Sequence, residues 1–83
     1  ENPYEGISVY PNPTSGKFTL GPVPSHLQSL DVEILNLEGQ MIESKKCAGK
    51  TNYAFDLTKL PRGCYILRFE TEEKMVSYKV ILR

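Results

Sequence analysis

The chain has 83 residues, of which ten are Lys or Arg and ten are Asp or Glu, so its formal net charge is zero. A chain of this length forms one small domain that buries about 60 to 65% of the surface its unfolded form exposes, which leaves little room for a deep active-site cleft. Neither sign of charge runs for more than three residues. This pattern excludes the clustered basic stretch of a nucleic-acid-binding protein, so no nucleic acid is predicted as a partner.

The sequence shows no targeting or membrane-spanning segment. It has no run of about 18 apolar residues, the length that a transmembrane helix needs, and no charged-then-apolar leader. Because the first residue is Glu1 and not Met, we expect the chain to be one module of a longer protein whose leader lies upstream. Residues 1–6, ENPYEG, are interpreted as the end of a linker, and residues 7–83 as the domain.

Apolar and polar residues alternate with a period of two along most of the chain, and no helical stripe exceeds two turns. The pattern predicts seven short strands separated by turn signals. The expected strands span residues 7–10, 17–20, 30–35, 40–44, 53–57, 64–70 and 76–82. Because each half-buried strand needs a second sheet over its apolar face, the predicted fold class is all-β, a seven-stranded antiparallel Ig-like sandwich of Greek-key type.

The segment VYPNPTSGKFTL, residues 9–20, joins the first two expected strands. Pro11 and Pro13 fix their own φ and keep the residues before them out of the helical region. Gly16 then allows the chain to reverse into the second strand. We predict a rigid turn that offers a partner a preformed surface.

Three further segments carry turn chemistry. In NLEGQ, residues 36–40, Asn36 begins a type I turn and Gly39 supplies a positive φ, which predicts a hairpin. The segment ETEEK, residues 70–74, is polar throughout and predicts a second hairpin. The segment GPVPSHLQS, residues 21–29, contains two prolines, so we expect it to cross between sheets or edges rather than join a ladder.

The segment LPRGCY, residues 60–65, places a proline and a glycine just before a tyrosine that begins a core strand. This arrangement resembles the tyrosine corner of Greek-key sandwiches, in which the phenol oxygen bonds a backbone group a few residues upstream. Cys64 then points to the face opposite Tyr65. A disulfide between Cys47 and Cys64 would have to lie outside the core, and the sequence leaves that bridge open.

No group of residues predicts catalysis. His26, the sole histidine, is interpreted as a loop residue without the partners of a hydrolase triad or a zinc site. Glu70, Glu72 and Glu73 crowd one hairpin tip, whereas a calcium loop spaces its oxygen ligands around a sharp glycine turn. The segment PTSGK, residues 13–17, lacks the first glycine and the Lys-Ser/Thr pair of a phosphate loop. We predict a domain that is not an enzyme and has no metal and no cofactor.

Three blocks of the sequence resemble successive motifs of a known family. They are VYPNPTSGKFTL at residues 9–20, VEILNLEGQMI at residues 32–42 and LTKLPRGCYILRFETEEKMVSYKVIL at residues 57–82. The resemblance runs in order from Ile7 to Arg83. Together the blocks are similar to the C-terminal sorting domain of cargo proteins of the type IX (Por) secretion system.

This resemblance implies a non-catalytic sorting signal at the C-terminus of a larger exported protein. The cargo would pass through the periplasm and reach the outer membrane, the cell surface or the extracellular space. The implied partners are the outer-membrane secretion machinery, that is, a translocon, a shuttle protein and a sortase. In most members the sortase removes the domain and joins the cargo to lipopolysaccharide, while some members keep the domain.

The family motifs also imply which residues the translocon or sortase recognises. Carried over by position, they are Tyr10, Pro11, Asn12, Pro13, Gly39, Gly63, Tyr65, Lys79, Val80, Ile81, Leu82 and Arg83. Many members end in lysine where this chain has Arg83, and Cys64 stands where a small aliphatic or polar residue is commoner. If the last strand lies at a sheet edge or beside the first strand, a receptor captures it by strand addition or by binding its terminal carboxylate.

An alternative function belongs to a different class. An Ig-like adhesion or carbohydrate-binding module of a cell-surface protein would share the fold, and fold alone does not separate the two functions. The chain has five Tyr and no Trp, and its Tyr residues are too scattered for a continuous sugar-binding platform. Open edge strands also leave a weak homodimer as an option.

Overall fold

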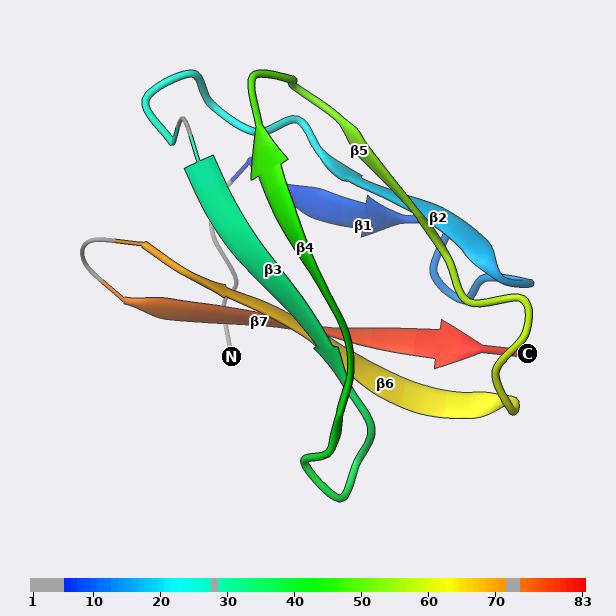
Figure 1. The fold of residues 1–83 in the computed structure, drawn as a ribbon. Helices are drawn as coiled ribbons and strands as arrows, with labels where there is room; N and C mark the ends of the chain where they lie inside the picture. Colours follow the sequence, from blue (N-terminus) through cyan, green and yellow to red (C-terminus); the bar gives the residue numbers. More distant parts are fainter. Residues whose placement is uncertain (1–5, 28, 72–73) are drawn as a thin grey trace.

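The period-two alternation places the apolar side chains of each strand on one face, and two sheets bury these faces against each other (Figure 1). The computed structural model describes residues 6–27, 29–71 and 74–83, and these residues contain no helix. The strands are β1 (Ser8–Tyr10), β2 (Lys17–Gly21), β3 (Ser29–Leu35), β4 (Met41–Ala48), β5 (Tyr53–Asp56), β6 (Gly63–Glu70) and β7 (Met75–Leu82). The predicted all-β fold with seven strands is confirmed.

One sheet has three strands in the order β1-β2-β5, and the other has four strands in the order β4-β3-β6-β7. All strand pairs within the two sheets are antiparallel. The segment from Pro22 to Leu27 leads from β2 in one sheet to β3 in the other, as its prolines predicted. The Greek-key assignment and the domain limits at residues 7–83 stay predictions.

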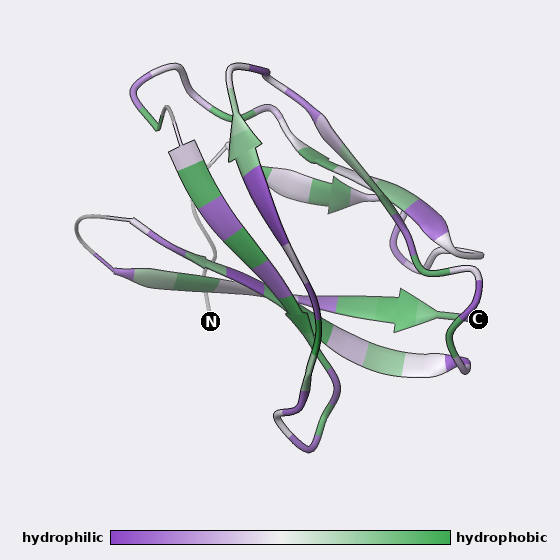
Figure 2. Ribbon diagram, viewed as in Figure 1, coloured by the Kyte–Doolittle hydropathy of each residue, from purple (hydrophilic) through white to green (hydrophobic). Residues whose placement is uncertain are grey.

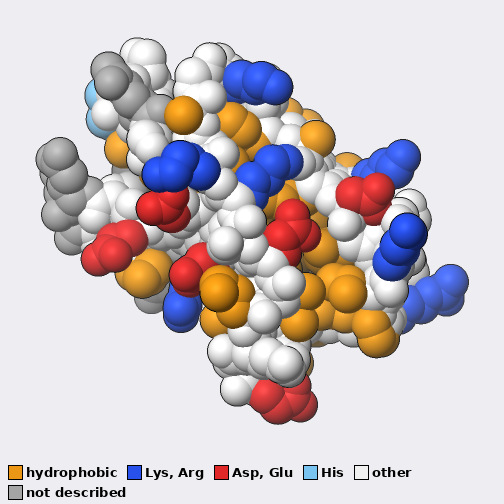
Figure 3. Space-filling view, viewed as in Figure 1, with side chains coloured by type: hydrophobic (Ala, Val, Ile, Leu, Met, Phe, Trp, Pro, Cys, Tyr) orange, Lys and Arg blue, Asp and Glu red, His pale blue; other side chains and the backbone are white. Residues whose placement is uncertain are grey.

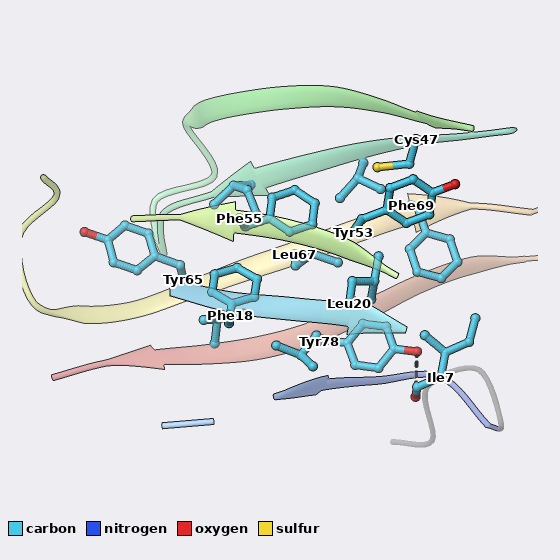
Figure 4. Close-up of a cluster of buried hydrophobic side chains, with 14 of the residues drawn as sticks. Ile7, Phe18, Leu20, Cys47, Tyr53, Phe55, Tyr65, Leu67, Phe69 and Tyr78 are labelled. Atoms are coloured by element: carbon cyan, nitrogen blue, oxygen red, sulfur yellow. Dashed lines mark hydrogen bonds between the residues drawn. The ribbon is translucent and has the colours of Figure 1, made fainter. Parts of the chain in front are cut away.

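The core lies between the sheets and contains the inward residues of all seven strands. Figure 2 shows the alternation of hydrophobic and hydrophilic residues along β3. In the centre, the rings of Phe18 and Phe55 stack with centroids 5.3 Å apart. Figure 4 shows the Tyr78 hydroxyl pointing toward Ile7, whose carbonyl oxygen accepts its hydrogen bond at 3.2 Å. Burial of these faces provides most of the driving force for this fold.

β4 is longer than the sequence predicted. The prediction stopped early because Lys45, the register partner of buried Val32, places a charge where the apolar alternation would otherwise continue. The expected strand covered residues 40–44, whereas β4 runs from Met41 to Ala48. The Lys45 ammonium crosses to β5, where its Nζ donates to the Ala54 carbonyl oxygen at 2.5 Å and lies 4.7 Å from the centroid of the Phe55 ring. An inward-pointing charge on an edge strand also opposes pairing with other chains.

The two predicted hairpins form as expected. In the first, Asn36 Oδ1 accepts hydrogen bonds from the Glu38 and Gln40 N–H groups, and Gly39 has a φ of +88°. The second joins β6 to β7, which pair from Gly63 with Leu82 up to Glu70 with Met75. Its residues 72 and 73 lie outside the described residues, as do residues 1–5 of the expected linker.

Both cysteines are free thiols, so the option of a disulfide is not realised. Cys47 is buried in the core on β4. Burial raises the pKa of the Cys47 thiol, with the Lys45 charge acting in the opposite direction. Cys64 is half-buried on the outer face of β6, as predicted from its offset to Tyr65, and β3 separates β6 from β4.

Candidate recognition site at one end of the sandwich

Residues 12–14, in the connection between β1 and β2, run along the outer edge of β7 (Figure 1). The Asn12 side chain makes two of the contacts. Its Nδ2 donates to the Lys79 carbonyl oxygen at 2.6 Å, and its Oδ1 accepts from the Ile81 N–H at 2.9 Å. One amide side chain therefore satisfies two outward-facing backbone groups of β7.

Thr14 continues the contact with its backbone. Its N–H donates to the Ile81 carbonyl oxygen at 2.8 Å, and its carbonyl oxygen accepts from the Arg83 N–H at 2.9 Å. These bonds form a short parallel bridge between Thr14 and Leu82. The structure thus joins the first predicted recognition block to the last one, although they lie at opposite ends of the sequence.

The local sequence explains why a side chain replaces the backbone here. Pro11 and Pro13 have no N–H, so this segment cannot form a regular ladder with β7. Asn12, between the two prolines, supplies a donor and an acceptor from its side chain instead. Thr14 is the first residue after the prolines with an N–H group, and it resumes backbone pairing.

Thr14 is a site residue that the sequence interpretation missed. It is 2% exposed, and its Oγ1 donates to the Lys17 carbonyl oxygen at 2.7 Å and accepts from the Gly16 N–H at 2.9 Å. Gly16 has a φ of +146°, and a Cβ at this position would overlap the Thr58 side chain. The available signal was a β-branched hydroxyl residue directly after a Pro-Asn-Pro run, a position where Ser and Thr commonly bond nearby backbone.

Gly63 and Tyr65 support this site from the neighbouring strand, β6. In the register of β6 and β7, Gly63 pairs with Leu82 and Tyr65 pairs with Val80. The Tyr65 hydroxyl donates to the Pro61 carbonyl oxygen, which confirms the predicted tyrosine corner. Tyr65 therefore fixes the connection from β5 to β6 beside the end of β7.

The predicted recognition residues fall into three groups. Seven are exposed at or near this end of the sandwich: Tyr10, Pro11, Asn12, Pro13, Lys79, Ile81 and Arg83. Tyr65, Val80 and Leu82 are buried, and Gly63 is exposed at the start of β6. Gly39 lies apart, at the tip of the β3–β4 hairpin at the bottom of Figure 1, where its positive φ serves the turn. The structure therefore brings together all of the predicted residues except Gly39.

β7 forms an edge of the four-stranded sheet, but part of this edge is covered. Residues 12–14 occupy the outward backbone groups from Lys79 to Arg83. They make no hydrogen bond to Met75 or Ser77, which face outward on the first half of the strand. Strand addition along the second half would require displacement of residues 12–14.

Within the described ranges, no three His, Cys, Asp or Glu residues are arranged to hold a metal ion. His26 is exposed in the connection between β2 and β3. Of the expected acidic tip, Glu70 lies at the end of β6, and Glu72 and Glu73 lie outside the described residues. The same ranges contain no helix that is long and apolar enough to cross a membrane.

Comparison with known proteins places the chain in a family. The family model of the secretion system C-terminal sorting domain matches residues 8–83. Among curated proteins, none matches the chain significantly. The match spans all seven strands, including residues 12–14 and the β7 edge that they cover. The chain belongs to the family of secretion system C-terminal sorting domains and is a type IX sorting signal for export to the cell surface or the extracellular space.

Proposed function

We propose that residues 10–14 and residues 79–83 form one composite surface that the outer-membrane type IX translocon recognises in the periplasm. The observation that supports this proposal is the set of four hydrogen bonds that ties Asn12 and Thr14 to the outer edge of β7. These bonds hold the exposed side chains of both blocks in one arrangement before any partner arrives. A partner that binds a preordered surface avoids the entropic cost of ordering it.

The proposed sequence of events follows the family. A shuttle protein and a sortase act after the translocon, and the sortase joins the cargo to lipopolysaccharide. The domain itself catalyses no reaction and serves as the recognition signal that these partners bind. Its role is binding, so exposed side chains at this end matter for recognition, whereas Val80 and Leu82 matter for folding.

Export of a reporter tests the proposal. A leader-bearing fluorescent protein carrying residues 1–83 at its C-terminus is expected to reach the surface of a host with a type IX system. Removal of residues 80–83 is expected to leave the reporter in the periplasm. Because this deletion removes buried Val80 and Leu82, its thermal unfolding must still be cooperative for the result to count.

Two point variants on the same face of β7 avoid the folding problem. Ile81 is 36% exposed beside residues 12–14, and Met75 is 52% exposed at the other end of the strand. Ile81→Asn is expected to reduce surface fluorescence, whereas Met75→Asn, the matched control, is expected to retain it. Equal export of both variants would contradict a recognition surface at this end.

A further inference from the structure

Half of the basic residues of the chain gather at the end of the sandwich that carries residues 12–14. Five of the ten Lys and Arg residues lie there, and all five are exposed. They are Lys17, Lys59, Arg62, Lys79 and Arg83, which we name the basic end. Figure 3 shows Lys and Arg side chains projecting around this end, at the right of the view. Three of the five, in β2 and in the β5–β6 connection, lie outside the predicted recognition residues.

Strand pairing and the contacts of Thr14 bring these residues together from distant parts of the sequence. Arg62 precedes Gly63, which pairs with Leu82, so Arg62 and Arg83 flank one pair of strand residues. Thr14 bonds the Arg83 N–H with its carbonyl oxygen and the Lys17 carbonyl oxygen with its hydroxyl. Lys17, Lys79 and Arg83 of the basic end therefore contact residues 12–14 through backbone groups.

The charges of Lys17 and Lys59 both act on one carboxylate, that of Asp56. Lys17 is the register partner of Asp56 across β2 and β5. The side-chain hydrogen bond from Thr58 is the main cause that lowers the pKa of Asp56, and the charges of Lys17 and Lys59 add to the shift. Asp56 therefore lies among these cations, and Glu43 lines the same surface hollow as Asp56 and Lys59.

Two of the other five basic residues are paired with carboxylates. Lys46 forms an ion pair with Asp31 at 3.4 Å, and Arg68 forms one with Glu33 at 2.8 Å. Both ion pairs found in the described ranges lie outside the basic end. The zero net charge of the chain thus conceals an uneven distribution, with excess positive charge at one end. Such a distribution orients a molecule as it approaches a charged partner.

We propose that the basic end docks on a carboxylate-rich surface of a protein partner. This inference rests on the proposed function and gives the chemistry of the translocon component that reads the composite surface. A protein partner is favoured over a polyanion for two reasons. Asp56, Ile81 and the prolines interrupt the cations, as expected for a protein interface with complementary charges and apolar contacts. A uniform layer of phosphates would be repelled by Asp56 and by the acidic remainder of the neutral chain.

A set of charge variants tests the basic end without changing residues 79–83. The triple variant Lys17→Gln, Lys59→Gln, Arg62→Gln removes three charges from it. We expect surface fluorescence of the reporter to fall about tenfold or more, because charge complementarity controls the rate of encounter. The variant Lys17→Arg, Lys59→Arg, Arg62→Lys keeps the charges and is expected to keep export.

A matched control removes the same number of charges elsewhere. The variant Lys46→Gln, Lys50→Gln, Lys74→Gln changes three exposed residues outside the basic end and is expected to be exported like the original chain. Equal loss of export in both Gln triples would overturn the inference, as would full export of both. Failure of the unchanged chain to direct export would instead refute the proposed function, so the two failures are distinguishable.

Binding by the purified chain separates a protein partner from a lipid surface. The chain is expected to bind immobilised poly-L-glutamate at low salt, and to lose this binding in the basic-end Gln triple but not in the control triple. Screening by salt is expected to abolish binding, because the charges are exposed. Binding to vesicles of an anionic phospholipid without binding to poly-L-glutamate would overturn the inference in favour of a lipid surface.

Discussion

Single side chains at this end of the sandwich form hydrogen bonds that backbone groups usually form. Asn12 stands between two prolines and pairs with the edge of β7 through its amide. Asp56 stabilises the turn after β5 in a similar way, because its Oδ1 accepts from both the N–H and the hydroxyl of Thr58. Each contact requires a particular functional group, so conservative substitutions at these positions are informative.

Asp56 gives a prediction about pH. Hydrogen bonds from Thr58, together with the charges of Lys17 and Lys59, lower the pKa of Asp56 in the folded chain. A depressed folded pKa contributes stability above the unfolded pKa of about 4, and that contribution is lost as the pH falls through the folded pKa. The stability difference between the original chain and Asp56→Asn is therefore expected to shrink from pH 5 downward. Urea unfolding at several pH values measures it, and a constant difference would contradict the prediction.

The connections between strands are fixed by specific polar contacts rather than by apolar burial alone. Asn36 closes the β3–β4 hairpin, and Tyr65 pins the β5–β6 connection to the Pro61 carbonyl oxygen. Lys45 links β4 to β5 across the open side of the sandwich. These contacts fix the connections between the strands, and the β5–β6 connection leads into the start of β6, which pairs with the end of β7.

The tyrosine corner gives a prediction about stability. Tyr65→Phe removes the hydroxyl that bonds Pro61 and leaves a partly buried carbonyl oxygen without this donor, so we expect a loss of about 1 to 2 kcal/mol in the free energy of unfolding. Tyr10→Phe is the matched control, because Tyr10 is 45% exposed and its hydroxyl lies 3.3 Å from Asn52 Oδ1. It is expected to cost about 0.5 kcal/mol or less. Similar losses in both variants would contradict a special role for Tyr65.

The two sheets of the whole molecule are joined by more than their shared core. Residues 12–14 belong to the connection within the three-stranded sheet, yet they bond to the last strand of the four-stranded sheet. The Tyr78 hydroxyl makes a second connection of this kind to the carbonyl oxygen of Ile7. Segments from opposite ends of the sequence therefore depend on each other for stability.

Thr14 tests this dependence at the scale of the whole molecule. Thr14→Val keeps the shape but removes one buried and one partly buried hydrogen bond, so we expect a cost of about 2 kcal/mol. For a domain of this size such a loss lowers Tm by about 8 to 16 °C. Thr19→Val, a change of the same type on the outer face of β2, is expected to shift Tm much less. Circular dichroism should show one cooperative transition in all three proteins, and separate melting of the two sheets would contradict the coupling.

Local patterns determined much of this structure. The period-two alternation predicted all seven strands, because a half-buried strand must place its apolar residues on one face. The chemistry of Asn36 and Gly39 predicted the first hairpin, and the spacing from Pro61 to Tyr65 predicted the tyrosine corner. The three ordered blocks predicted the sorting-domain family, which the match over residues 8–83 confirms.

Tertiary structure alone decided how distant segments meet. The alternation does not specify which strands are neighbours, so the bonds from Asn12 and Thr14 to β7 and the burial of Cys47 were not predictable from local sequence. Lys45 concealed the length of β4, because a charged residue facing inward breaks the pattern that identifies a strand. Cations that are scattered along the sequence gather at one end only after the strands pair. Periodicity reports which face of a strand is buried, whereas long-range pairing determines which surfaces are built together.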